Sequence, residues 1–303
     1  MYDSLFAEGG LSLERLKVLL EVYDAGSIAQ AAPSDTVRQS QYSRQLRELA
    51  EFFGCEVTQR QGKVLKLSAE GVRLSEVARE ALRGLNDFRA DCRSEKVVFN
   101  IGAGDSLIQW LVIPRLGRML TKVPHVRVGT LNLRTQDIVR QVTDTRVDFG
   151  LVRKNALLPG LKSAPLGNLA YVAVVPESLV APGKAPTLAR LFAEYPLAMQ
   201  TTEGEFSNRL REMAQAANTT LHPALSCQSF PQVFAAVKSE RFAAILPEIA
   251  ARELPTTKFR TLAAEPLRSL QREIILLWNP RVIKVRPKAA ALLTHLQTVL
   301  RLS

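Results

Sequence analysis

Residues 26–32 read GSIAQAA, residues 41–49 read QYSRQLREL and residues 57–71 read VTQRQGKVLKLSAEG. Gly26 is suited to end a helix, Ser27 can cap the short helix that follows, and Pro33 stops that helix. A capping box of Thr36 and Gln39 predicts a second helix over residues 37–53. A basic hairpin over residues 57–67 comes next. This order predicts a winged helix-turn-helix module.

The second helix carries two kinds of side chain. Tyr42, Leu46, Leu49 and Phe53 share one face, and polar residues occupy the rest of the cylinder. Gln can pair with adenine, Arg with guanine or phosphate, and Ser with either base, while a basic hairpin meets phosphates. The expected DNA contacts are Ser27, Arg38, Gln39, Ser40, Gln41, Ser43, Arg44, Arg47, Arg60, Lys63 and Lys66. A winged helix that docks only protein is the alternative.

At these residues the chain resembles the LysR-type transcriptional regulators. The family pattern G-S-[FI]-x-x-A-A, S-Q-x-x-x-S-R-Q-[IL]-x-x-L and L-T-x-x-G appears in order within residues 26–71. The chain departs from it at Asp35, Arg38, Ser40, Gln41 and the pair Val57-Thr58. The resemblance implies a dimer or tetramer that binds a dyad of T/A-rich half-sites and responds to a small-molecule effector, often a carboxylate.

Length and charge limit the possibilities. At 303 residues the chain suits two or three units. The net charge of +11 indicates anionic partners, but residues 1–94 hold 13 Lys and Arg against 14 Asp and Glu. The three cysteines are far apart, no run of about 18 apolar residues occurs, and the first ten residues lack a basic residue. We therefore expect a cytoplasmic protein with no membrane partner.

Residues 69–93 predict a long polar helix with one narrow apolar seam. The seam contains Leu74, Ala78, Ala81, Leu85 and Phe88, at alternating steps of four and three. Such a seam needs a partner, which is either a second copy of the helix or the first helix of the same chain. The resemblance favours a homodimer or homotetramer.

From residue 97 strands alternate with helices, which predicts an α/β sheet. Strands are expected at residues 97–102, 126–133, 149–152, 171–175, 196–199, 224–227 and 271–278. The whole chain is thus predicted to be an α/β protein with an N-terminal, all-α winged helix-turn-helix domain. Its C-terminal effector domain is expected to have two lobes, like a type 2 periplasmic binding protein. The expected boundaries are 1–68 for the DNA-binding domain, 69–94 for the linker helix and 95–303 for the effector domain, with lobe I at 95–170 and 268–303 and lobe II at 171–267.

Ligands of such sheets bind outside the carboxyl ends of the strands. The residues expected there are Asp105, Ser106, Arg134, Thr135, Arg153, Thr201, Thr202, Gln228 and Ser229. For Ser106, Thr135 and Ser229 the alternative is helix capping without a ligand role. Glu240 and Phe242 stand where the family has two glycines, and we expect them to reshape the cleft.

The chain shows no catalytic pattern. Its three histidines are scattered, and neither H-E-x-x-H nor G-x-S-x-G occurs. We therefore predict no enzyme, no metal site and no cofactor. The expected partners are double-stranded DNA, a small-molecule effector that is a candidate anion, further copies of the chain, and RNA polymerase as a further candidate. The alternative is a solute-binding or sensory protein with a degenerate DNA reader, motivated by Asp35, Arg38 and the acidic balance of the N-terminal part.

Overall fold

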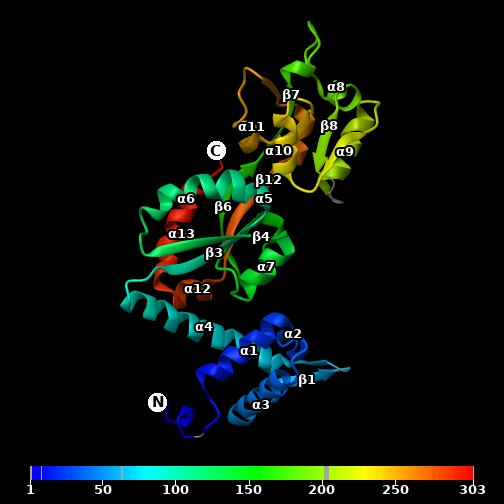
Figure 1. Ribbon diagram of the computed structural model, residues 1–303. Coiled ribbons are helices and arrows are strands. Elements are labelled where there is room, and N and C mark those ends of the chain that lie inside the picture. The colour runs from blue at the N-terminus through cyan, green and yellow to red at the C-terminus, as the bar shows by residue number, and fades with distance from the viewer. Residues whose placement is uncertain (1, 8, 63, 201–204, 303) are drawn as a thin grey trace. The chain divides into compact units, whose positions relative to one another are not determined.

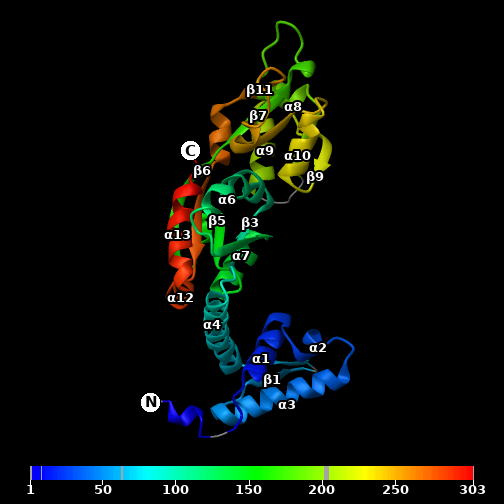
Figure 2. The same ribbon diagram turned by 60° about the vertical axis from the view of Figure 1, so that its left-hand side comes forward.

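The computed structural model describes residues 2–7, 9–62, 64–200 and 205–302. The chain forms two compact units, Met1–Glu95 with Arg281–Pro287 and Lys96–Pro280 with Lys288–Ser303. Figures 1 and 2 show the elements of each unit from two directions. No helix among the described residues is long and apolar enough to cross a membrane.

The N-terminal unit is a set of helices followed by a hairpin and a long helix. Ser12 caps the first long helix by accepting from the Arg15 amide, and Gly26 ends it at φ 87°, as the sequence predicts. Ser27 caps the next helix by accepting from the Gln30 amide. The elements are η1 Asp3–Leu5, α1 Leu13–Ala25, α2 Ile28–Ala31, α3 Thr36–Phe53, β1 Thr58–Gln61, β2 Val64–Leu67 and α4 Ala69–Cys92.

The start of α3 differs from the sequence prediction. Asp35, not Thr36, is the N-cap, and its carboxylate accepts from the Arg38 amide at 2.9 Å. Aspartate is among the strongest caps, because its oxygen satisfies a free amide of the first turn. Gln39 does not close a capping box: its side-chain amide donates to the Ala32 carbonyl at 2.7 Å. The departure at Asp35 therefore has a structural role in the turn.

One hydrophobic core holds these elements together. Leu19 and Val22 of α1 pack with Leu46 and Leu49 of α3, and all four are almost fully buried. Gly71 lets α4 approach the hairpin, since a Cβ there would lie 2.1 Å from the Val57 carbonyl oxygen. Only glycine fits such a contact without moving the backbone.

One face of the linker helix α4 packs against the core of the N-terminal unit, and another face of the helix is exposed to solvent. Ala78 is buried in the N-terminal core, so the alternative of packing on the chain's own first helices is confirmed for that part of the seam. Val77, Leu85 and Phe88 are 63%, 55% and 68% exposed.

The segment Arg281–Pro287, which includes all of α12 (Pro280–Val285) except its first residue, is held on α4 by ion pairs. Arg286 donates to both carboxylate oxygens of Asp87, at 2.6 and 3.0 Å, and both side chains are buried. Arg281 reaches Glu76 at 3.1 Å in a more exposed pair. A buried, bidentate pair fixes position more strongly than an exposed one.

The C-terminal unit contains two main sheets. The five-stranded sheet has the order β4-β3-β5-β12-β6, with β3 parallel to β4 and β5, and β12 antiparallel to β5 and β6. The three-stranded sheet has the order β10-β7-β11, and β8 pairs with β9 in a small parallel sheet. Both views show α7 and α13 on opposite sides of the five-stranded sheet (Figures 1 and 2).

The predicted strands of this unit are all present, with ends shifted by at most one residue. Strand β6 belongs to the larger sheet and β7, two residues later, to the smaller one. The larger-sheet elements are β3 Val97–Ala103, α5 Asp105–Leu107, a π-helical turn Ile108–Val112, α6 Ile113–Leu120, β4 Val126–Asn132, α7 Thr135–Thr143, β5 Phe149–Arg153, β6 Lys162–Leu169, β12 Arg272–Trp278 and α13 Pro287–Val299. The others are β7 Tyr171–Pro176, α8 Leu188–Ala193, β8 Leu197–Gln200, α9 Glu205–Ala216, β9 Pro223–Cys227, α10 Phe230–Lys238, β10 Ala244–Pro247, α11 Glu248–Ala251 and β11 Phe259–Leu262.

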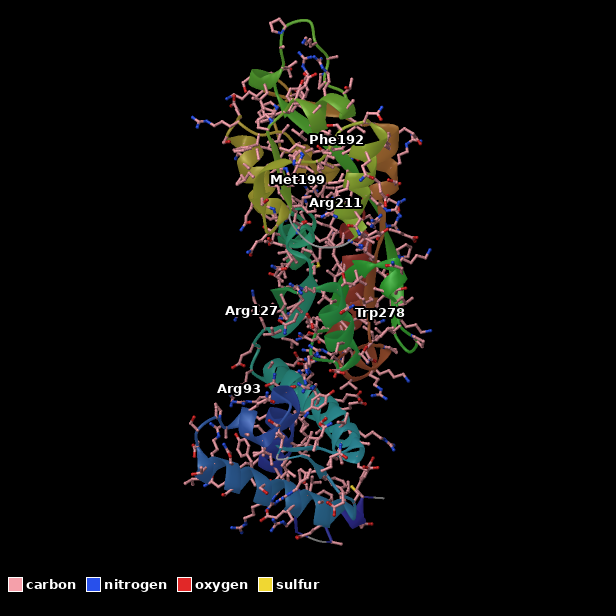
Figure 3. All side chains as sticks on the ribbon, turned by 90° about the vertical axis from the view of Figure 1, so that its right-hand side faces the viewer. Arg93, Arg127, Phe192, Met199, Arg211 and Trp278 are labelled. Atoms are coloured by element: carbon pink, nitrogen blue, oxygen red, sulfur yellow. The ribbon has the colours of Figure 1, made fainter. Side chains whose placement is uncertain are left out.

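The sequence did not predict β6, β10, β11, α8, α11 or α12. Strand β6 includes Pro165 and Gly167, residues that weaken a strand prediction. Its pairing with β12 continues through a register shift between Ile274 and Ile275. Figure 3 shows Phe192 of α8 and Met199 of β8 in the same part of the unit, and both line one small internal cavity.

Replacing Asp87 with Ala should destabilise the N-terminal unit by about 3–5 kcal/mol, because Arg286 would stay buried without its partner. Hydrogen–deuterium exchange of α4 peptides in increasing urea would measure this loss. Adding Arg286→Met to the Asp87→Ala protein should recover part of it. The matched control is Glu76→Ala, which breaks an exposed pair and should cost less than about 1 kcal/mol. Equal effects of Asp87→Ala and Glu76→Ala would contradict the role given to the buried pair.

Candidate functional site

Helix α3 presents a polar surface opposite its buried stripe. Ser40, Gln41, Arg44 and Arg47 are exposed, and Ser43 is half-buried. Tyr42, Leu46 and Leu49 are buried on the other side. The polar side chains expected from the sequence therefore lie on the accessible side of the helix, where a DNA groove could receive them.

Two of the expected DNA contacts have other functions in the structure. Ser27 is 2% exposed, and its hydroxyl accepts from the Gln30 amide as the cap of α2. Gln39 is half-buried and tied to the Ala32 carbonyl. Both side chains stabilise the turn between α2 and α3, so Ser27 is better explained as a helix cap than as a phosphate contact.

Ion pairs organise the arginines of α3. Arg38 donates to the Tyr42 hydroxyl at 2.8 Å, lies over the Tyr42 ring and reaches Glu21 of α1 at 3.4 Å. The Tyr42 hydroxyl also donates to Glu21, and burial followed by this bond raises the pKa of Tyr42. Arg38 is thereby oriented along the surface of the helix.

Glu48 holds two arginines from different helices. It accepts from Arg15 of α1 and from Arg44 of α3, the latter at 3.0 Å. The hydrogen bond from Arg15, and then that from Arg44, lowers the pKa of Glu48. The Arg44 side chain is nevertheless 80% exposed, so it remains accessible to an incoming anion.

The hairpin provides the expected wing. Thr58 pairs with Leu67 and Gln61 with Val64, which leaves a two-residue turn. Gly62 has φ 63°, and Arg60 is exposed while Lys66 is half-buried. Lys63 lies outside the described residues.

The sequence reasoning missed Val37. This residue is 68% exposed in the first turn of α3, four positions before Gln41. From the sequence, an apolar residue at the start of a helix is assigned to the hydrophobic core. Only the exposure of Val37 in the folded unit identifies it as a surface residue. An exposed apolar side chain beside polar readers can contact the methyl group of thymine.

The predicted effector residues gather around one cavity in the C-terminal unit. The cavity measures about 1090 Å³, a size that suits a small organic molecule. The predicted residues that line it are Asp105, Ser106, Arg134, Thr135, Arg153, Gln228 and Ser229. Thr201 and Thr202 lie outside the described residues.

The alternative of capping alone is not supported for the three hydroxyl residues. Arg134, not Thr135, is the N-cap of α7, and Ser106 lies inside α5. Ser229 is the N-cap of α10, but its side chain makes no capping hydrogen bond. These hydroxyl groups therefore do not cap their helices, and the three residues line the cavity.

Further lining residues were not predicted from the sequence. The aromatic residues Tyr171, Phe206 and Phe230 form one cluster in the cavity wall, with ring centroids 5.0, 5.7 and 5.4 Å apart. Burial raises the pKa of Tyr171. Arg272 at the start of β12 also lines the cavity, and burial lowers the pKa of its guanidinium. An apolar pattern identifies the three aromatic residues as core residues, and Arg272 begins a strand rather than following one.

Glu240 and Phe242 are not among the described residues that line the cavity, and their expected effect on the shape of the cleft stays a prediction. Glu240 has a left-handed backbone with φ 61°, a conformation that favours glycine. Its side chain pairs with Lys258 at 2.6 Å, away from the cleft. No group of three or more His, Cys, Asp or Glu side chains that could hold a metal occurs in the described part of the chain.

A helix-turn-helix with a wing and a two-lobed α/β cleft define the class of bacterial regulators that join a DNA reader to a ligand sensor. Residues 13–72 match the model of the bacterial regulatory helix-turn-helix proteins of the lysR family, and residues 93–301 match the LysR substrate binding domain. The chain belongs to the LysR family.

Individual proteins show the same likeness. The uncharacterized HTH-type transcriptional regulator YhjC of Escherichia coli is 26% identical over 166 residues, which cover 53% of this chain and 54% of YhjC. The chain thus spans about half the length of this curated relative. Among solved structures, full-length OxyR of Pseudomonas aeruginosa has a TM-score of 0.64 at 15% identity, with 96% of each chain covered. LysG of Corynebacterium glutamicum, solved with arginine as bound effector, has a TM-score of 0.58 at 16% identity, covering 93% of this chain and 98% of LysG.

Proposed function

We propose that this protein regulates transcription by binding specific DNA sequences through α3 and the wing, under the control of a small molecule in the C-terminal cleft. The observation that carries the proposal is the exposed polar stripe of α3, formed by Ser40, Gln41, Arg44 and Arg47 on a helix whose opposite face is buried. Membership of the LysR family, with its helix-turn-helix and its substrate-binding domain, supports both halves of the proposal.

The alternative, a sensory protein with a degenerate DNA-binding domain, is motivated by Asp35 and Arg38, and both residues have a structural role. Asp35 caps α3, and Arg38 is held by Tyr42 and Glu21, so both departures from the family pattern have a place in a well-formed module. Two carboxylates of the acidic N-terminal part, Glu21 and Glu48, pair with arginines of α3. We also propose that the protein acts as a regulator in the cytoplasm rather than as a catalyst.

We propose a homo-oligomer built through α4. Its exposed residues Val77, Leu85 and Phe88 stand at steps of eight and three, on one side of the helix. A second copy of α4 would bury this face and would place two reading helices on two half-sites. A tetramer and a contact with RNA polymerase are further proposals that rest on the family resemblance alone.

The direct test is operator binding by an Arg44→Ala variant. Affinity for a selected operator should fall by about 1–3 kcal/mol if Arg44 contacts a base, and specificity should relax at one position of each half-site. Fluorescence anisotropy with the selected duplex and a scrambled duplex measures both effects. Arg211→Ala, an exposed arginine of α9, is the matched control and should leave affinity unchanged (Figure 3). Unaltered binding by Arg44→Ala would remove α3 from the interface.

Val37→Ala tests the apolar contact. If Val37 meets a thymine methyl group, the variant should lose about 1 kcal/mol of operator affinity, roughly the value of one buried methylene group. Replacing thymines one by one with uracil in the operator removes the methyl groups instead. The wild-type protein should be sensitive at one thymine per half-site, and Val37→Ala should be insensitive there. A variant that keeps the wild-type pattern of uracil sensitivity would exclude this contact.

A further inference from the structure

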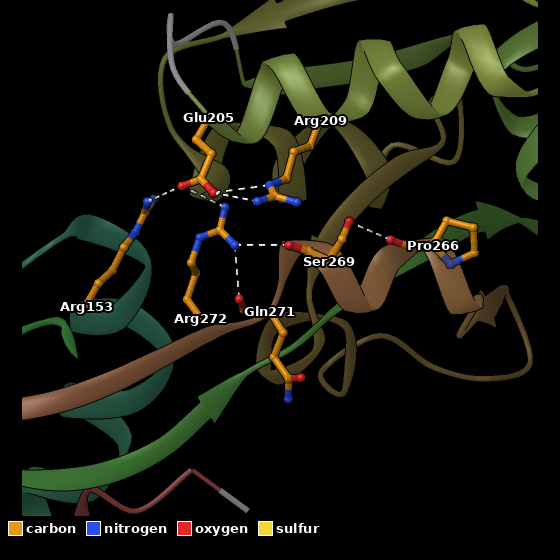
Figure 4. A network of polar contacts seen from close by, with 7 residues as sticks. All are labelled: Arg153, Glu205, Arg209, Pro266, Ser269, Gln271 and Arg272. Atoms are coloured by element: carbon orange, nitrogen blue, oxygen red, sulfur yellow. Dashed lines mark hydrogen bonds and ion pairs between the residues drawn. The ribbon is translucent and has the colours of Figure 1, made fainter. Parts of the chain in front are cut away.

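Three arginines surround a single carboxylate (Figure 4), and two of them, Arg153 and Arg272, line the cavity. Glu205, the first residue of α9, lies 3.6 Å from Arg153, 3.2 Å from Arg272 and 3.0 Å from Arg209. The hydrogen bond from Arg209 lowers the pKa of Glu205. Three positive side chains face one negative side chain, so this group, which we name the Glu205 cluster, carries excess positive charge.

Arg272 is the least satisfied member of the Glu205 cluster. Its side chain is only 12% exposed, and its Nη1 donates to the carbonyls of Ser269 and Gln271 at 3.2 and 3.0 Å. Its Nη2 is buried and makes no hydrogen bond of good geometry within the described residues, although it stays in ionic contact with Glu205. A buried donor without a well-aligned acceptor is costly, so this nitrogen favours an anion that fits it better.

The same wall of the cavity is aromatic. Tyr171, Phe206 and Phe230 line it together with Arg153 and Arg272. Burial raises the pKa of Tyr171, and the positive charges of Arg153 and Arg272 oppose that rise. Aromatic rings stack edge to face with other rings, and guanidinium groups pair with carboxylates in a fork. One ligand that satisfies both features has a ring and a carboxylate.

We propose that the cleft binds an aromatic monocarboxylate, and that Glu205 occupies the place of the ligand carboxylate when no ligand is bound. The ligand carboxylate pairs with Arg272 and Arg153, and its ring lies against Phe206 and Phe230. Glu205 keeps Arg209 as its partner and its side chain, already 47% exposed, turns toward water. This assignment rests on the proposed function, because it names the ligand class of the proposed effector site.

Replacement of the Glu205 carboxylate by the ligand carboxylate would also change the contacts between α9 and the five-stranded sheet. Glu205 begins a helix that packs with the second lobe, whereas Arg153 and Arg272 belong to β5 and β12 of the five-stranded sheet. Binding of the ligand breaks these two ion pairs and replaces them with contacts to the ligand. The ligand thereby favours a different position of α9 relative to the five-stranded sheet. A ligand shifts the populations of two conformations only if it binds one of them more tightly than the other.

The competing interpretation is a purely structural ion cluster, and Glu205→Gln separates the two. This variant keeps a hydrogen-bonding side chain next to Arg209 but removes the competing charge. If Glu205 stands in for a ligand, the variant should bind aromatic acids several-fold more tightly than the wild type. If the cluster is only structural, its binding should be unchanged or weaker. Glu273→Gln is the matched control, because Glu273 pairs with Lys154 at 3.0 Å and lies on the same strand as Arg272.

The experiment is isothermal titration calorimetry of the full-length protein with benzoate, phenylacetate and 3-phenylpropanoate, each compared with its carboxamide. At least one acid should bind, and its amide should bind roughly tenfold more weakly because it cannot form a charge-assisted pair. Arg272→Lys, which retains the charge but not the fork, should weaken binding of the acid. Thermal unfolding of each variant confirms that it is folded.

Three results would overturn the assignment: no acid binds, the amides bind as well as the acids, or Glu205→Gln fails to tighten binding. Operator binding by the same preparations tests the proposed function separately. Specific DNA binding without acid binding would reject only the ligand class, whereas loss of both would reject the regulator itself.

Discussion

The pairing of β12 with both β5 and β6 is the constraint on which the C-terminal unit depends. Ile274 of β12 stands opposite Arg153, the last residue of β5, and Arg272 stands opposite Leu169, the last residue of β6. Because β12 is antiparallel to its neighbours, its first residue meets the ends of theirs. Arg153, Arg272 and Tyr171 therefore reach the same edge of the sheet, although more than a hundred residues separate the first of them from the second. The charged and aromatic wall of the cleft is a consequence of this register.

This register also explains which part of the cleft could be predicted from sequence. Asp105, Arg134 and Arg153 lie at or just beyond the ends of strands β3, β4 and β5, and parallel strands all end at one edge, so a local pattern is enough to place them. Arg272 is the first residue of its strand rather than a residue that follows one, and its position depends on pairing with residues far away in the chain. Phe230 opens a helix and Tyr171 opens a strand whose residues are all buried, so both resemble core residues until the cavity is seen.

The DNA-reading unit shows a similar division. The 3.6-residue period of Tyr42, Leu46 and Leu49 determines which side of α3 is buried, so the buried side can be predicted from the sequence alone. A period does not show whether a polar side chain is already used inside the module. Ser27 and Gln39 bond to backbone groups of the turn, and Asp35 replaces Thr36 as the cap, because short polar side chains next to a helix start find free amides and carbonyls first.

Carboxylate–guanidinium pairs fix elements in place in one part of the protein and hold arginines ready for a ligand in the proposed sites. The burial of the pair determines which of these roles it can have. Asp87 and Arg286 are both buried, so an incoming ion cannot replace either partner without leaving a buried charge alone. Arg44 and Glu205 have partners too, but each is largely or half exposed, and an exposed pair adds little to stability. At the two proposed sites, a phosphate beside Arg44 or a ligand carboxylate beside the Glu205 cluster would therefore replace the internal partner at small cost. The pairs of Arg44 and Glu205 at the two proposed sites are thus exposed, whereas the pair of Asp87 and Arg286 that holds α12 on α4 is buried.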